Sequence, residues 1–353
     1  MPKPLPSAAL FVLALIAALG AAAGPGGPHV MPKTTVRPFG APPPAAPAGA
    51  HLTYYGGRIV PHIQVIQVLW GTGSYATQVS STATPSVASF YNAVLQGNTW
   101  DWLAEYNTPA SGGTNQQYTR GNFVRQVTIT PSTSATTLTD ATIQLELQAQ
   151  ITAGHLPAPT KDAAGNPTTY YAIFFPRGVV LTQGGQTSCV AGGFCAYHGT
   201  VSSRVLGEFY YAAQPDMQVG SGCDTGCGSG TPFANITAVA SHELAETITD
   251  PEIGLATVIG PPLAWYDATN GEIGDICNAQ DGTFVGGDGQ VYGIQTEFSN
   301  VTNACIVTRA APVPPGSTSP GNASSTDGPL PPWALAGLGA ALLAIAGVRL
   351  RGR

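Results

Sequence analysis

Charged side chains are scarce in this 353-residue sequence, at 9% of its residues, against about 25% in an ordinary soluble protein. Basic residues are the scarcer kind: residues 51–308 hold six lysines and arginines but 18 aspartates and glutamates, a formal balance of −12. A body with this excess of negative charge repels phosphate backbones, which argues against nucleic acid as a partner. Hydrophobic residues make up 43% of the chain, enough for a buried core, and the 44 glycines and 31 prolines are typical of a loop-rich extracellular protein.

Long apolar runs are confined to the two ends of the sequence, and both predict export. Residues 1–23 combine a lysine, an apolar run and a stretch of alanines, which are the parts of a secretory signal peptide. Residues 333–348 form a second apolar stretch, predicted to be a transmembrane or sorting helix, and the basic tail 349–353 would stay in the cytoplasm. This end resembles the C-terminal sorting tails of bacterial surface proteins, with a plain membrane anchor as the alternative. We therefore expect an exported protein, at the cell surface or anchored in the membrane, with its globular domain outside the cytoplasm.

Two segments rich in proline, alanine, glycine and serine separate these ends from a folded body. Residues 24–50 and 309–332 have the composition of extended linkers without a core. The globular domain is therefore expected at residues 51–308, a region that contains all six cysteines of the chain.

Strand and helix patterns alternate along this body and predict a mixed α/β fold. Runs of β-branched and aromatic residues indicate strands, and the pair Asp250-Pro251 marks the end of the clearest helix, because a residue before proline is biased away from the α conformation. Strands are expected at 63–70, 123–129, 170–175 and 208–213, and helices at 86–95, 100–106, 140–151 and 233–249. Such alternation favours a central mixed β-sheet flanked by helices, with a zincin-like α+β arrangement as the alternative.

The helix expected at 233–249 carries the sharpest chemical signal, the motif His-Glu-Leu-Ala-Glu at 242–246. A spacing of four places His242 and Glu246 one turn apart on the same face, so both can reach one cation. Glu243 occupies the position of the general base in an H-E-x-x-H metalloprotease. A glutamate stands here in place of the second histidine, and its charge makes a bound zinc ion a weaker Lewis acid. Zinc binding therefore tolerates this difference better than peptidase activity does.

The distribution of charge supports a metal site near this helix. Residues 205–308 contain 13 acidic residues and no lysine or arginine. Buried carboxylates without a cation are costly, so their partners must be distant basic residues, water or a metal ion.

Acidic turns after the helix offer candidates for a third ligand, and Asp275 or Glu272 is favoured. Asp250 could instead cap a neighbouring loop, and Glu252 has the offset at which some metalloproteases place a third histidine. Calcium is the alternative to zinc, because it takes six to eight oxygen ligands and tolerates irregular loops. Such a calcium site would be built from Asp267, Glu272 and Asp275, with Asp281 as an optional additional ligand.

The six cysteines fit an exported chain with three disulfides, although sequence alone leaves their connectivity open. Pairing by proximity gives Cys189–Cys195, Cys223–Cys227 and Cys277–Cys305. A disulfide at Cys195 would remove it as a thiol nucleophile beside His198, which argues against a cysteine hydrolase. His198 is then a structural histidine or an additional imidazole ligand.

Several segments, in order, resemble the phosphate-induced protein 1 or EXORDIUM-like family. They are Tyr-Tyr-Gly-Gly-Arg-Ile-Val at 54–60, Gly-Phe-Cys-Ala-Tyr-His-Gly at 193–199 and Thr-Asp-Pro at 249–251. Residues 241–307 resemble bacterial surface relatives of that family. The resemblance implies a secreted, cell-wall-associated protein, and it supports location and fold more than catalysis.

Two functions remain open at this point. In the first, the body is a zinc-dependent hydrolase or peptidase, with His242 and Glu246 as ligands and Glu243 as general base. In the second, it is a non-catalytic surface module in which a structural calcium or zinc ion supports a face that binds a peptide, a cell-wall polymer or another protein.

Overall fold

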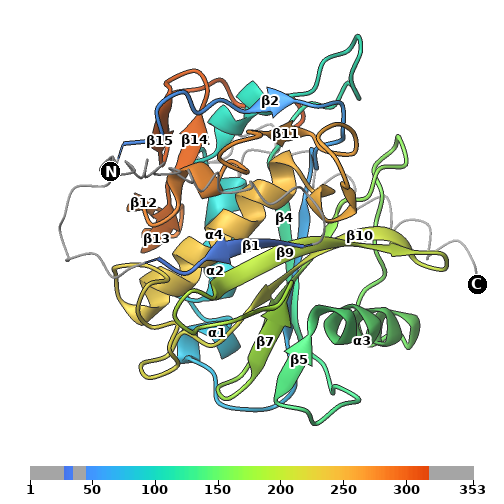
Figure 1. The fold of residues 1–353 in the computed structure, drawn as a ribbon, viewed down its shortest axis with the longest axis vertical. Helices are drawn as coiled ribbons and strands as arrows, with labels where there is room; N and C mark the ends of the chain where they lie inside the picture. Colours follow the sequence, from blue (N-terminus) through green and yellow to red (C-terminus); the bar gives the residue numbers. More distant parts are fainter. Residues whose placement is uncertain (1–27, 35–44, 318–353) are drawn as a thin grey trace, which may run out of the picture. The chain divides into compact units, whose positions relative to one another are not determined.

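A six-stranded mixed sheet forms the centre of the computed structural model, which describes residues 28–34 and 45–317 (Figure 1). Three neighbouring pairs are parallel, and the two pairs at the β1 end are antiparallel. The predicted mixed α/β fold with a central mixed sheet is confirmed. The strands, in spatial order, are β1 (His29–Pro32), β9 (Phe194–Ser203), β10 (Gly207–Gln214), β6 (Thr169–Phe174), β3 (Gln64–Leu69) and β4 (Asn122–Thr128).

Helices cover both faces of this sheet, because its central strands bury side chains on both sides. Alternate residues of β3 divide between the two cores: Val65 packs with helices α2 and α4, whereas Ile66 packs with helix α3. Each helix therefore buries an apolar face against the sheet. The helices are α1 (Thr77–Ser80), α2 (Val87–Gln96), α3 (Asp140–Thr152) and α4 (Pro232–Thr249), with 3₁₀ turns η1 (Asp101–Tyr106), η2 (Ile253–Leu255) and η3 (Asp275–Cys277).

Short sheets surround this core. β12 and β13 form a hairpin, and β13 lies against α4. These strands are β2 (Thr53–Tyr54) with β11 (Trp265–Tyr266), β5 (Thr137–Thr139) with β7 (Val180–Gln183) and β8 (Gln186–Thr187), β12 (Asp281–Val285) with β13 (Val291–Gln295), and β14 (Glu297–Ser299) with β15 (Ala304–Ile306).

The predicted elements occur within a few residues of their expected bounds, with two differences. The sequence pattern of helix 140–151 suggests Asp140 as its cap, but Asp140 is the first residue of α3, and the side chain of Thr139 accepts the capping hydrogen bond instead. The long strand β9 was not predicted. Eight of its ten residues are buried in succession, so its sequence lacks the alternation of apolar and polar residues that reveals a half-buried strand.

The ordered body is longer than residues 51–308. Residues 29–32, inside the predicted linker 24–50, form the edge strand β1, so the linker prediction is wrong there. At the other end, Arg309 pairs with Glu105 (Nη2 to Oε2, 2.6 Å), and the side chain of Ser317 accepts a hydrogen bond from the backbone N–H of Arg120 (2.9 Å). Composition predicted linkers at both ends, but strand pairing, an ion pair and a hydrogen bond attach these residues to the body.

The predicted export signals lie outside the described residues. These signals are the signal peptide at 1–23, the apolar helix at 333–348 and the basic tail at 349–353. Among residues 28–34 and 45–317, no helix combines the length and apolar character needed to cross a bilayer.

Three disulfides are present, but two of the pairings predicted from sequence proximity are wrong. The bonds join Cys189 to Cys223, Cys195 to Cys227, and Cys277 to Cys305, so only the last prediction is confirmed. Cys223 and Cys227 lie in the segment 222–227. One forms a disulfide with Cys189, just before β9, and the other with Cys195, at the start of β9. Three disulfides are typical of an oxidising, extracellular environment.

Candidate metal centre

Helix α4 presents the His-Glu motif to the interior of the molecule. Its N-terminus is capped by Thr231, whose side chain accepts a hydrogen bond from Ala234, and a proline occupies its first turn. Beyond that turn the helix is buried, since it packs beneath β9 and against β13. His242, Glu243 and Glu246 are therefore fully buried.

Three of the predicted ligands come together at this helix. Nε2 of His242 lies 3.1 Å from Oε1 of Glu246, and the same oxygen accepts a hydrogen bond from the backbone N–H of Asp275 (3.1 Å). One potential ligand atom from each of His242, Glu246 and Asp275 lies within 4.8 Å of the other two. We refer to these three residues as the central group.

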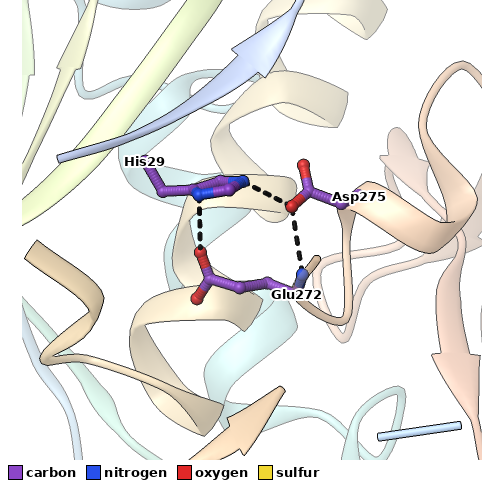
Figure 2. Close-up of side chains that lie close together, drawn as sticks. All are labelled: His29, Glu272 and Asp275. Carbon is purple, nitrogen blue, oxygen red and sulfur yellow. Dashed lines mark hydrogen bonds and ion pairs between the residues drawn. The ribbon is translucent and has the colours of Figure 1, made fainter. Parts of the chain in front are cut away.

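Glu272, the other predicted acidic ligand, faces a histidine from β1 rather than His242 (Figure 2). Nδ1 of His29 is 3.8 Å from Oε2 of Glu272, and Nε2 of His29 is 2.5 Å from Oδ2 of Asp275. These three residues form a second possible set of metal ligands. It adjoins the central group, because Asp275 belongs to both.

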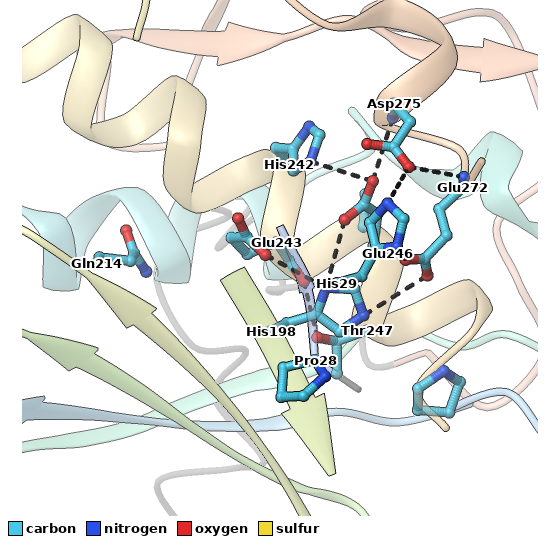
Figure 3. Close-up of polar contacts among 12 residues, drawn as sticks. Pro28, His29, His198, Gln214, His242, Glu243, Glu246, Thr247, Glu272 and Asp275 are labelled. Atoms are coloured by element: carbon cyan, nitrogen blue, oxygen red, sulfur yellow. Dashed lines mark hydrogen bonds and ion pairs between the residues drawn. The ribbon is translucent and has the colours of Figure 1, made fainter. Parts of the chain in front are cut away.

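A third set contains the predicted base, Glu243 (Figure 3). Nδ1 of His198, on β9, lies 3.2 Å from Oε2 of Glu243 and 3.3 Å from Oε2 of Glu246. Its other nitrogen, Nε2, lies 3.5 Å from Oε1 of Glu272. His198 thus lies between the carboxylates of α4 and the turn at 272, and the three sets form one connected cluster of histidines and acids.

Several buried polar atoms of this cluster lack a hydrogen-bonded partner. Nε2 of His242 is within ion-pair distance of Glu246 but does not have hydrogen-bond geometry toward it. Among the described residues, no lysine or arginine forms an ion pair with an acid of the cluster. Buried polar atoms normally have partners, so imidazole and carboxylate atoms that converge without them fit a metal cation. The unpartnered atoms are Nε2 of His198, Nε2 of His242, Oε1 of Glu243, Oε2 of Glu246, and both carboxylate oxygens of Glu272.

In the absence of a cation, protons balance the charge of the cluster. Burial alone would lower the pKa of His198, but the adjacent carboxylates of Glu243 and Glu246 raise it to about 9. Burial likewise opposes the charge on His242, yet the neighbouring Glu246 raises the pKa of His242 well above its ordinary value. Burial and the nearby carboxylates raise the pKa of Glu272 well above its ordinary value, which favours its protonated form in the folded chain. A divalent cation could replace these protons.

Neighbouring groups fix the ring of His242. The side-chain amide of Gln295 lies 2.8 Å from Nδ1 of His242 and 2.9 Å from the carbonyl oxygen of Gly274. Nε2 is thereby left facing Glu246. Contacts of this kind orient the histidine ligands of metal sites.

Other acids considered from the sequence are engaged elsewhere. Asp250 accepts a hydrogen bond from the backbone N–H of Ala264 (2.7 Å), which matches its predicted role as a cap for a loop. Glu252 accepts a hydrogen bond from Nε of Arg58 (2.7 Å).

Two members of the predicted calcium site also lie outside the cluster. Asp267 accepts hydrogen bonds from the backbone N–H groups of His51 and Thr269, both 2.8 Å. Asp281 accepts one from Ser229 (3.2 Å). The four-acid calcium site is therefore not assembled as predicted, and the acids that do meet, Glu272 and Asp275, are accompanied by His29.

Sequence analysis did not identify two ionisable residues, His29 and Glu297, as part of the metal centre or its surroundings. His29 is a lone histidine in a proline-rich tract, and no local pattern indicates its role. Glu297 is fully buried and both its carboxylate oxygens lack partners. Burial raises the pKa of Glu297 well above its ordinary value, and its position in the acid-rich segment 205–308, which has no lysine or arginine, was the only available signal.

Comparison with known proteins does not identify the chain: no family model, no curated protein and no solved structure matches it.

Proposed function

We propose that this protein is an exported zinc-dependent hydrolase whose ion is held by the central group, His242, Glu246 and Asp275. The observation that carries the proposal is the convergence of these buried ligand atoms, with Nε2 of His242 left without a hydrogen-bonded partner. The donor set favours zinc over calcium, because an imidazole nitrogen suits zinc and calcium prefers oxygen ligands. The location rests on the predicted signal segments and on the three disulfides.

The residues beside the ion suit proton transfer. Zinc would supply Lewis acidity that polarises a substrate carbonyl. Glu243 and His198 are fully buried, and 3.2 Å separates Oε2 from Nδ1, so the pair can hold one proton between them. Glu243 would then be the general base that takes a proton from the attacking water and becomes neutral, and His198 would hold its carboxylate in position before the transfer.

The test is the zinc content of the purified full chain, together with its hydrolysis of a fluorogenic peptide library. We expect about one zinc ion per chain, lost in His242→Ala and in Asp275→Asn. Glu243→Gln should retain the metal and lose hydrolysis by about 10²-fold or more. His155→Ala is the matched control, because His155 contacts Gln150 on α3 and not the cluster.

A wild-type chain without zinc would contradict the proposed site. If Glu243→Gln cleaved at the wild-type rate, the assignment of the base would be wrong even with zinc present.

The second candidate is a non-catalytic surface module with a structural cation. Its support is the complete burial of His198, His242, Glu243, Glu246 and Glu272, which leaves little access for a substrate. Zinc retained in full with no hydrolysis of any library peptide would favour this function.

A further inference from the structure

The strand that closes the metal centre comes from the far N-terminal side of the chain. β1 is the outermost strand of the central sheet and pairs antiparallel with β9 (Figure 1). Without β1, the backbone N–H and C=O groups along that edge of β9 would be free to pair with another extended chain.

Among the described residues, the members of the cluster whose side chains reach solvent are His29 of β1 and Asp275. His29 is directly opposite His198 in the register of the two strands, so their side chains lie on the same face of the sheet. The side chain of His29 is 26% exposed and that of Asp275 is 10% exposed, whereas those of His198 and Glu272 are fully buried. A substrate that approaches the cluster on the side of β1 would have to displace His29.

Backbone contacts hold β1 and its flanking residues in addition to the side-chain contacts of His29 and Lys33. The side-chain amide of Gln183 donates to the carbonyl oxygen of Pro28 (2.8 Å), and that of Asn278 donates to the carbonyl oxygen of Pro32 (3.0 Å). Met31 is the one residue of β1 that is buried in the core, at 3% exposure. Backbone contacts accept many sequences, whereas the buried site at Met31 selects an apolar side chain.

We propose that the edge of β9 is a binding site for an extended polypeptide, and that β1 is an intrachain peptide that occupies it. The ligand is a strand that pairs antiparallel with β9 and places an apolar side chain in the Met31 site. Its residue two positions earlier then lies over the metal centre, where His29 is now. Resting on the proposed function, this inference makes extended polypeptides the substrate class of the hydrolase.

The occupant has an advantage over any free peptide because it belongs to the same chain. Tethering gives a segment an effective concentration of about 1 mM. A free peptide should therefore bind the wild-type chain weakly, and a change that expels β1 should reveal the site.

The experiment compares full-length wild type with Met31→Asp, using a fluorescein-labelled peptide of the sequence Pro-His-Val-Met-Pro-Lys-Thr (residues 28–34) and fluorescence anisotropy. A charge at the buried position should release β1, so we expect peptide affinity at least 10-fold higher than in wild type. Hydrogen exchange at the β9 amides should be faster in the variant and slow again when peptide is added. Val124→Asp is the matched control, because Val124 is 43% exposed on β4, and a peptide with aspartate in place of methionine should not bind either protein.

Failure of the inference and failure of the proposed function give different results. If Met31→Asp binds zinc and exposes β9 but does not bind the peptide, the peptide site is wrong. The same holds if β9 stays protected in the variant and no peptide binds. Peptide binding by a chain that holds no zinc would support the peptide site and contradict the hydrolase. Should Met31→Asp fail to fold, Met31→Ala takes its place, because it weakens β1 and leaves the labelled peptide unchanged; we expect a severalfold gain in peptide affinity, and no gain would overturn the inference.

Discussion

Gly274 leaves no room for a side chain beside the metal centre. A Cβ atom at this position would lie 2.6 Å from Nδ1 of His242 and 2.8 Å from Oε1 of Glu246. The turn at 271–275 therefore approaches α4 closely enough to bring Asp275 to the helix. Glycine is required here by close approach and not by a left-handed backbone.

We expect Gly274→Ala to weaken zinc binding at least 10-fold, because the added methyl group must displace His242 or Glu246 from the ion. Titration against a chromophoric chelator would measure the affinity. Gly287→Ala is the matched control, since no atom lies within 4 Å of its added Cβ. Equal zinc affinity in the two variants would show that the central group does not hold the metal.

Two buried groups predict how the stability of the metal-free protein depends on pH. Burial raises the pKa of Asp250 from 3.8 to about 8. Burial opposes the charge of His198, but the carboxylates of Glu243 and Glu246 outweigh it and raise the pKa of His198 from 6.5 to about 9. Both groups hold their protons more tightly in the folded chain than in the unfolded chain. The free energy of unfolding should therefore fall as pH rises from about 4 to about 9.

Zinc should oppose this trend, because its ligands bind it in their deprotonated forms and its affinity increases with pH. Urea unfolding at pH 6 and pH 8, with a chelator and with excess zinc, would test both parts. Stability that rises with pH in the chelator-treated chain would contradict the protonated state assigned to the cluster.

The residues of the metal centre differ in how well the sequence could predict their positions. His242 and Glu246 were predicted because a single helix fixes their spacing. Asp275 was one of two candidates, since a turn of unknown path separates it from the helix. His29 could not be predicted, because its position depends on the pairing of β1 with β9, and neither strand was recognised in the sequence.

Among the structural elements, β9 and the segment at 222–227 predict a testable disulfide pattern. Digestion with trypsin without reduction, followed by mass spectrometry, should yield peptide 178–204 joined to peptide 205–309, as the bonds of Cys189 to Cys223 and of Cys195 to Cys227 require. A tryptic site at Arg204 separates β9 from the second segment, so these crosslinks are distinguishable from local ones. Peptides that join Cys189 to Cys195 would contradict the path of the chain before β9.

A buried ion pair joins η1 to the start of β4. Arg120 donates from Nε and Nη2 to the two carboxylate oxygens of Asp101, at 2.8 Å and 2.7 Å. Their side chains are only 6% and 2% exposed, so removing the arginine leaves a buried carboxylate without its partner.

We expect Arg120→Ala to lower the free energy of unfolding by about 3 kcal/mol or more. Arg125→Ala, a change at an exposed position of β4, should alter it by less than about 0.5 kcal/mol. Chemical denaturation of both variants would measure the difference, and similar values would show that the ion pair contributes little.

Across the whole molecule, the sequence predicted the fold class better than it predicted the first and last residues of the folded domain. The alternating strands and helices of 63–249 follow from local patterns, and the central sheet confirms them. The boundaries at 51 and 308 were placed by composition, which cannot register contacts such as the pairing of β1 or the ion pair of Arg309. Composition indicates which segments lack a core of their own, but it does not show which of them join the core of a neighbour.

The spread of the centre along the chain sets the order in which it can be assembled during synthesis. His29 leaves the ribosome early, whereas Asp275 follows only after most of the body has been made, and both the helix and the sheet edge come between them. No shorter nascent fragment carries a complete set of ligands. If the central group binds zinc as proposed, products truncated before residue 275 lack one of its three ligands and are expected not to retain the metal.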